Sequence, residues 1–573
     1  MILGVTLYAQ DFSALQVGFQ TPPPEARPQV WWHWMNGNIT RDGIRKDIEW
    51  MDRAGIAGFH VFDAGLNTPQ VVPERLVYMT GPWKEAFRYA VEIGKEHGME
   101  INIATSPGWS ATGGPWVKPE DAMKRLTWRE MRVEGGKKIK AELPEPYTTT
   151  GKFQDAELGS NVMDATSTLM KKTQHYRDIA VIAVRMLPQD RTLSELGAVI
   201  SSSGGNFSLE KMTDGSMSSI CRLPADKETG YGWIQYEFPA PQTIAAVSVS
   251  DGRIRDYWND DEPTWTSVLE CSQDGKSFTE VVKIPSGSAC LQTVSFPPVQ
   301  ARFFRLKVAN PLPDLSMAAY GASTQAPKYS KIAEFNLFPT ARIHHAEEKA
   351  GFASPHDLHA YRTEAKGDFP TEVLDLTDFV HDGILEWDVP EGNWKVFRFG
   401  HALTGKLNHP APREATGHEV DKLDPVAYER YFRQYLDTYQ EALGGTLRGL
   451  DYLMMDSYEA EQQTWTPAMR EEFLSRRGYD LLPWLPVLAG EILESAACSE
   501  QFLLDWRKTI SELYAENYDR VSGLAREYGL KGRYTESHEN GRVYVVDGMD
   551  VKRLSEIPMS ACWIPTPGAG STL

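Results

Sequence analysis

Short apolar runs alternate with amphipathic stretches in the first 105 residues, in an order that predicts a parallel sheet. The apolar runs predict buried strands and the stretches between them repeat their apolar side chains at helical spacing: strands at 30–35, 58–63 and 99–104, helices at 41–54 and 83–97. Thr40 is a suitable N-cap for the first helix, and Gly55 follows its end. This succession of strands and helices is the βα unit of an α/β protein.

The same pattern returns in the last 150 residues. Residues 424–443 and 499–528 predict amphipathic helices, and the apolar runs 450–455 and 531–536 predict strands. Polar or aromatic residues come at the ends of the predicted strands: Asn36, Asp63, Trp109, Asp456 and Glu536. In an α/β barrel such residues face the active-site mouth. Counting a last short strand at 557–560, we expect six or seven strands of a (β/α)8-type barrel.

Between the two α/β parts, apolar and polar residues alternate in short runs separated by turn residues, which predicts β-sandwich modules inserted into the barrel. The fold class is thus multidomain α/β plus all-β. The expected divisions are an N-terminal segment and linker (1–27), the first part of the barrel (28–124), an inserted β-sandwich (125–345), a second β-rich insert (346–419) and the second part of the barrel (420–573).

The composition of the chain excludes some classes of binding partner. The net charge is −19, from 59 basic and 78 acidic residues, and there is no basic run, which argues against nucleic acid and anionic membrane surfaces. A neutral carbohydrate substrate fits better, and no apolar run is long enough to insert into a membrane. The apolar residues 1–10 resemble the end of a secretory signal peptide, so we expect a secreted or periplasmic protein. Five cysteines show no zinc-binding spacing.

Two acidic clusters suit glycoside hydrolysis, which needs two carboxyl groups across the scissile bond. Glu459 follows one predicted strand, while Glu536 and Glu539 lie at the end of another, so we expect Glu459 to pair with one of those two. Each acid taken singly is more simply a helix cap or a solvated residue, and such clusters could equally hold a hard cation. Candidate substrate-binding residues complete the prediction: Trp32, Trp34, Asn36, Asp63, Trp109, Asp456 and His538.

Several long motifs resemble glycoside hydrolase family 106, the α-L-rhamnosidases. They are Trp31–Thr40, Ser106–Val117, Thr404–Pro412, Ala415–Asp424 and Asp456–Glu459. The stretches Trp233–Phe238 and Ser272–Phe278 are similar to a discoidin-like sandwich.

The resemblance implies an exo-acting, inverting, calcium-dependent enzyme that releases terminal α-L-rhamnose, with Glu459 as general acid and Glu536 as a calcium or sugar ligand. The family motif that carries the general base matches Pro558–Trp563, where Ala561 replaces the glutamate. Glu536 or Glu539 would then activate water. The alternative is a degenerate, non-catalytic carbohydrate-binding member; a third hypothesis is an adhesion module in which the sandwich alone binds glycans.

Overall fold

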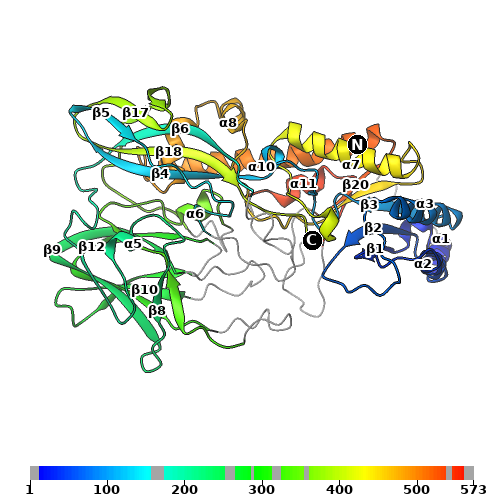
Figure 1. Cartoon of the computed structure of the whole chain (residues 1–573), viewed down its shortest axis with the longest axis horizontal. Coiled ribbons are helices and arrows are strands. Elements are labelled where there is room, and N and C mark those ends of the chain that lie inside the picture. Colours follow the sequence, from blue (N-terminus) through cyan, green and yellow to red (C-terminus); the bar gives the residue numbers. More distant parts are fainter. Residues whose placement is uncertain are drawn as a thin grey trace, which may run out of the picture.

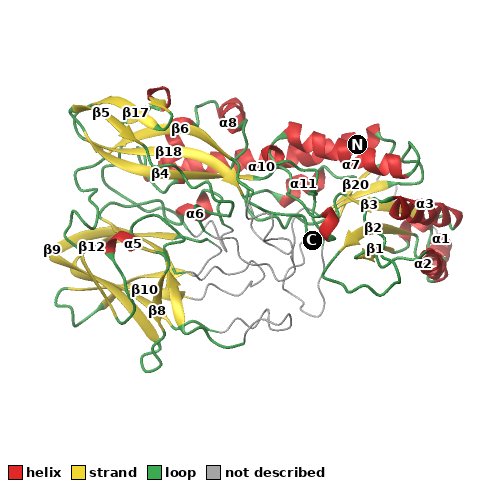
Figure 2. Ribbon diagram, in the orientation of Figure 1, coloured by secondary structure: helices red, strands yellow, loops and turns green. Residues whose placement is uncertain are grey.

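The computed structural model of the chain describes residues 12–156, 173–251, 265–285, 289–312, 324–353, 361–536 and 545–560. It has an α/β region at one end and two β-rich regions at the other, stacked one above the other in Figure 1. Figure 2 shows that the long helices belong to the α/β region, whereas the β-rich regions hold only short helical turns.

A six-stranded parallel sheet organises the α/β region. Its strands, in spatial order, are β1 (Gln29–Met35), β2 (Gly58–Ala64), β3 (Glu100–Ala104), β19 (Tyr452–Met455), β20 (Gly532–Thr535) and β21 (Ile557–Pro558). The sequence predicts all six, and β3 pairs with β19 although some 350 residues separate them. The described residues show no pairing between β1 and β21. The expected closed barrel is therefore not found in the described part of the chain, which holds an open sheet.

The helices of this region are α1 (Phe12–Gln20), α2 (Arg41–Arg53), α3 (Gly81–Glu96), α7 (Pro425–Ala442), α8 (Met469–Arg477), α9 (Leu485–Leu488), α10 (Ala496–Glu527) and α11 (Gly548–Arg553). Thr40 caps α2 as predicted, because its side chain accepts a hydrogen bond from Gly43 N.

Side chains of the sheet divide between two faces because successive residues of a strand point in opposite directions. On the helix face, Phe59, Ile103 and Leu453 join the large core formed with α2, α3, α7 and α10. On the opposite face, which we call the inner face, Phe62 and Met454 form a separate small cluster with Ala104 and Tyr534. The two faces decide which residues of each strand could reach a ligand.

The strands predicted as two separate inserts pair with each other. One sheet has the order β15 (Val373–Asp375), β6 (Tyr176–Arg185), β18 (Asn393–Leu403), β4 (Lys124–Glu134), and a second has β16 (Val380–His381), β17 (Ile384–Val389), β5 (Lys137–Glu142). Both pack on one shared core. The predicted boundary at 345/346 therefore does not separate these strands, because residues 124–185 belong with residues 373–403.

The remaining strands form the sandwich region with its own core. They are β7 (Val199–Ser202), β8 (Cys221–Pro224), β9 (Tyr231–Ser250), β10 (Trp265–Ser272), β11 (Thr279–Pro285), β12 (Gln292–Ala309), β13 (Tyr329–Ile332) and β14 (Glu334–Phe338), with the short helix α5 (Leu209–Met212) among them and α6 (Ala346–Lys349) after them. The sandwich thus begins near residue 193, later than the predicted residue 125.

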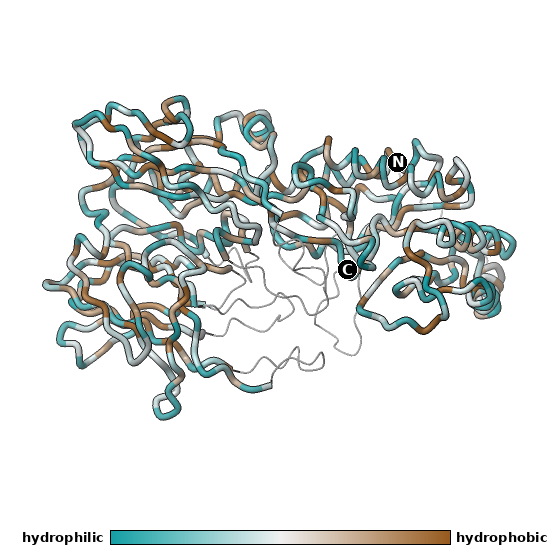
Figure 3. Tube along the Cα trace, in the orientation of Figure 1, coloured by the Kyte–Doolittle hydropathy of each residue, from teal (hydrophilic) through white to brown (hydrophobic). Residues whose placement is uncertain are grey.

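Hydrophobic and hydrophilic stretches alternate along the trace of the described chain (Figure 3). Among these residues, no helix combines the length and the apolar character that crossing a bilayer requires. Residues 1–11, on which the expectation of export rests, lie outside the described part.

Candidate active site

Two acidic residues stand at matching positions at the carboxyl ends of neighbouring strands. Asp456 follows β19 and Glu536 follows β20; the last paired residues are Met455 and Thr535, and Glu536 N donates to Met455 O at 3.2 Å. Both side chains are buried, with exposed fractions of 2% and 5%. Continuing the alternation of each strand directs both carboxylates to the inner face, on strands about 4.8 Å apart. One acid from each predicted cluster therefore stands at this edge of the sheet, on neighbouring strands.

Glu459 lies three residues beyond Asp456, and its side chain is 13% exposed. One carboxylate oxygen accepts a hydrogen bond from the Ser457 hydroxyl at 3.4 Å, and the other lies 3.9 Å from Nε2 of His409. The imidazole of His409 thus faces this carboxylate from another segment of the chain.

His409 is itself held by the loop that follows β3. Its carbonyl oxygen accepts from Trp109 N at 2.9 Å, and its own N–H donates to Ser110 Oγ at 3.0 Å. The loops at 105–117, 404–418 and 456–465 therefore meet at the carboxyl edge of the sheet. Each contains one of the motifs that resemble the rhamnosidases.

Trp109 connects these loops to β1. Its Nε1 donates to Nε2 of His33 at 2.8 Å, and the two rings meet edge to face. Burial lowers the pKa of His33, which favours the neutral imidazole that such a donor needs. His33 also stacks on Phe62 of the inner face, with centroids 5.4 Å apart. Trp109 remains partly exposed and is the predicted sugar-contacting tryptophan that lies at this edge.

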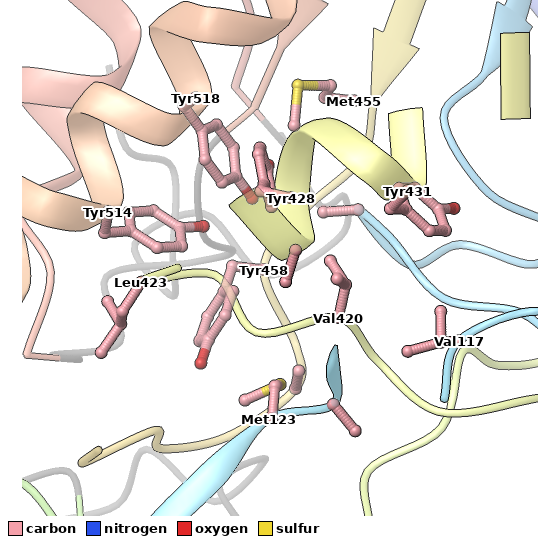
Figure 4. Packing of buried hydrophobic residues seen from close by; sticks show 14 of the residues in the cluster. Val117, Met123, Val420, Leu423, Tyr428, Tyr431, Met455, Tyr458, Tyr514 and Tyr518 are labelled. Carbon is pink, nitrogen blue, oxygen red and sulfur yellow. The ribbon is translucent and has the colours of Figure 1, made fainter. Parts of the chain in front are cut away.

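Residues 419–424 contact the loop that carries Glu459 and hold it in place. The Tyr458 ring packs edge to face on Tyr514 of α10, at 5.3 Å, and Lys422 Nζ lies 5.5 Å from its centroid. Figure 4 shows Tyr458 among the buried side chains of this core. Lys422 also donates to the carboxylate of Glu419 at 2.6 Å. Burial lowers the pKa of Lys422, and the Glu419 carboxylate opposes this shift because it stabilises the charged ammonium.

A second anchor lies between Asp421 and the far end of the same loop. Gln463 donates to Asp421 and accepts from Lys422 N at 3.0 Å. Asp421 also pairs with Lys124 of β4 at 3.1 Å, and both side chains are almost completely buried. The backbone that carries Glu459 is therefore fixed at both of its ends.

Trp32 and Trp34 lie on the helix face, so their placement corrects the expectation that they wall a sugar pocket. Trp32 Nε1 donates to Asp47 of α2 at 3.0 Å, and Trp34 packs on Trp83 of α3 with centroids 5.6 Å apart. Their exposed fractions are 9% and 2%. Strand alternation places His33, not the two tryptophans, on the inner face.

Asp63 and Asn36 also have structural partners. Asp63 is buried on the helix face and accepts from Trp83 Nε1 at 2.9 Å. Burial raises the pKa of Asp63 to about 7. Asn36, with a φ of 49°, donates to Thr68 O at 2.7 Å and so holds the loop after β1. These contacts do not bring either residue to Glu459.

Comparisons with known proteins show the family of the chain. The sequence model of the alpha-L-rhamnosidase family, glycoside hydrolase family 106, matches residues 20–572. The chain belongs to this family. A solved rhamnosidase from Novosphingobium sp. PP1Y is 36% identical with a TM-score of 0.81, over 97% of this chain and 50% of that one. A protein of Formosa agariphila named "Putative beta-glucuronidase" is 26% identical over 542 residues, which are 92% of this chain and 31% of that protein.

This family 106 chain therefore spans half or less of the length of these two relatives. Three of the residues on which the sequence prediction depends lie outside the described part: His538, Glu539 and Ala561. Of the two predicted partners of Glu459, Glu536 is the one that the structure describes.

Calcium requires six to eight oxygen ligands. Asp456 and Glu536 supply oxygens of the right kind, but the described residues contain no group of three or more His, Cys, Asp or Glu side chains placed to hold a metal ion. These residues do not by themselves form a calcium site.

Sequence reasoning missed His409 and Lys422 as site residues. Both lie inside the quoted family motifs, so the motifs were the available signal. Their roles depend on contacts with Glu459 and Tyr458, which are 50 and 36 positions away in the chain.

Proposed function

We propose that this chain is the catalytic part of an exo-acting glycoside hydrolase that releases terminal α-L-rhamnose from polysaccharides or glycosides with inversion. The observation that carries the proposal is the position of Glu459: a partly buried carboxyl group at the carboxyl edge of a parallel sheet, between Ser457 and His409, in a family 106 chain. The six-stranded sheet would be the larger part of a (β/α)8 barrel.

In this mechanism Glu459 protonates the leaving oxygen. A second carboxylate, Glu536 or Glu539, accepts a proton from the attacking water on the opposite face of the sugar. Inversion requires about 6.5–9.5 Å between the two carboxyl groups, to leave room for that water. Glu536 suits the role because it is buried on the neighbouring strand at the same edge. Trp109, partly exposed at that edge, would contact the sugar ring.

The alternative is a non-catalytic member of the family that binds carbohydrate. It is motivated by Ala561, which stands where the family motif carries the general base. The two functions differ in turnover and agree in binding, so one set of assays separates them.

The decisive experiment compares wild type, Glu459→Gln and Glu471→Gln on p-nitrophenyl α-L-rhamnoside. Glu471 is an exposed acid in the first turn of α8 and serves as the matched control. We expect Glu459→Gln to lower kcat by about 10²–10⁴-fold, the usual contribution of a general acid, and Glu471→Gln to leave kcat unchanged. A 2,4-dinitrophenyl leaving group needs less protonation, so the loss there should be smaller. Equal kcat for Glu459→Gln and wild type would remove Glu459 from the role of acid.

Two further readouts complete this test. Proton NMR of the first product should show the anomer opposite to that of the substrate; retention would refute the inverting mechanism. Repeating the assay with a chelator and then with added calcium tests whether the implied metal is needed. An absence of turnover under every condition, with rhamnose binding retained, would favour the non-catalytic alternative.

A further inference from the structure

The outer face of the sandwich sheet carries a group of aromatic and basic side chains that the proposed hydrolysis does not use. It lies where the first half of β9 pairs with the second half of β12. The inward residues of these strands, such as Ile234 and Leu306, are completely buried, whereas the outward residues Tyr231, Trp233 and Arg305 are partly exposed. We call these three residues, with Phe278, the outer-face cluster.

Arg305 is the centre of the cluster. Its guanidinium carbon lies 3.6 Å from the ring centroid of Phe278 and 4.6 Å from that of Trp233. Its Nε and Nη2 both donate to Gln235 Oε1, at 3.1 and 2.8 Å. Stacking and hydrogen bonding together fix the orientation of the planar group, so a ligand would meet a preorganised set of donors.

Phe278 is brought to Arg305 by the turn after β10. Asp274 Oδ1 accepts hydrogen bonds from Lys276 N at 2.8 Å and Ser277 N at 2.9 Å, and from the Ser272 hydroxyl at 2.9 Å. The two sequence stretches that resemble a discoidin-like sandwich, Trp233–Phe238 and Ser272–Phe278, therefore meet at one arginine.

The charge of Arg305 distinguishes it from the basic residues around it. Arg302 pairs with Glu237 at 2.7 Å and Lys307 with Glu270 at 3.6 Å. Arg305 has no carboxylate within 4.0 Å among the described residues, and Glu270, its cross-strand neighbour on β10, acts on it only at longer range. A guanidinium has five N–H donors, and Gln235 receives only two of them. A fixed, partly desolvated cation with unused donors is complementary to a carboxylate.

We propose that the outer-face cluster binds an acidic glycan through the carboxylate of a uronic acid residue. The carboxylate would accept hydrogen bonds from Arg305, and neighbouring sugar rings would pack on the exposed parts of Trp233 and Tyr231. The cluster lies on the sandwich sheet, whereas Glu459 follows β19 of the parallel sheet, so the cluster would hold polysaccharide without taking part in bond cleavage.

Calorimetric titration of the full chain with oligogalacturonate, and with its fully methyl-esterified form, tests the proposal. We expect binding of the acid, at least 10-fold weaker binding of the ester, and binding by Arg305→Ala and Trp233→Ala that is at least 10-fold weaker than wild type. Arg305→Lys keeps the charge but not the planar fork and should fall between wild type and Arg305→Ala. The thermal midpoint of each variant shows whether the sandwich remains folded.

The matched control is Arg222→Ala. Arg222 also stacks on an aromatic ring, Tyr329 at 4.7 Å, but on the small β8–β13 sheet of the same region. It should bind oligogalacturonate as wild type does. The proposal would be overturned if wild type does not bind oligogalacturonate, or if it binds the ester equally well. Equal losses of affinity in Arg305→Ala and Arg222→Ala would also overturn it. Equally tight binding of polyglutamate would replace the glycan by an acidic peptide and would overturn it too.

Discussion

Asp421→Asn tests whether a buried ion pair holds the loop that carries Glu459. One Asp421 oxygen accepts from Lys124 Nζ and from the Thr466 hydroxyl, each at 3.1 Å; the other accepts from Leu423 N at 3.0 Å. An asparagine would present an N–H₂ group to donors, and the Lys124 ammonium would lose its carboxylate while remaining buried.

The expected loss of unfolding free energy in Asp421→Asn follows from the burial of the ion pair. The exposed fractions of the Lys124 and Asp421 side chains are 1% and 0%. Removing one partner of such a pair costs about 3–5 kcal/mol of unfolding free energy, a large part of the roughly 5–15 kcal/mol typical of a folded protein. The matched control is Glu386→Gln, which breaks the surface pair with Lys140, whose side chain is 68% exposed. Such a pair contributes about 0–1 kcal/mol.

The assay is urea unfolding followed by tryptophan fluorescence, with Lys124→Met/Asp421→Asn as a third variant. The double variant leaves no buried charge, so it should recover part of the stability lost in Asp421→Asn. If Asp421→Asn unfolds at the same urea concentration as Glu386→Gln, the reasoning is refuted. The carbonyl oxygens of Glu120 and Ala122, each 2.8 Å from Lys124 Nζ, would then be sufficient to hold the cation.

Two more substitutions test buried polar groups on the helix face. Asp63 has its pKa raised by burial to about 7 from 3.8, so the folded state keeps a proton that the unfolded state releases. Wild-type stability should therefore fall as pH rises from about 4 to 7, and Asp63→Asn should lack this fall when unfolding midpoints are compared at pH 5 and 8; parallel curves would contradict it. Tyr435→Phe removes a 2.6 Å hydrogen bond to Ala104 O and should cost about 1–3 kcal/mol in urea unfolding. Tyr428→Phe, whose buried hydroxyl has no hydrogen-bond partner among the described residues, should cost much less, and equal losses would argue against this accounting.

Local patterns were sufficient to predict the elements of the parallel sheet. The strands, the Thr40 cap and the long helix α10 all lie within a few residues of their predicted positions, because hydrophobic periodicity and capping act over short stretches of chain. The same patterns could not show which β-strands pair. β4 and β18 pair across some 270 residues, and that partnership depends on the path of the chain between them.

The direction of the side chains on β1 shows the same limit. Residues 31–34 form one continuous run of aromatic side chains, which is expected of a strand covered on both faces. The sequence therefore shows no alternation from which the face of each side chain could be assigned. Only the packing of α2 and α3 puts Trp32 and Trp34 in the core and leaves His33 to meet Trp109.

By itself the sequence determined the family and the appearance of acidic residues at the ends of two predicted strands, because long motifs and short-range periodicity are properties of contiguous residues. The tertiary structure decided which of these residues meet. It placed Asp456 beside Glu536, turned Glu459 toward His409 and anchored its loop on Asp421 and Lys422. Such contacts join segments that lie far apart in the chain. They depend on strand register and on the paths of the loops, and a local sequence pattern encodes neither of these.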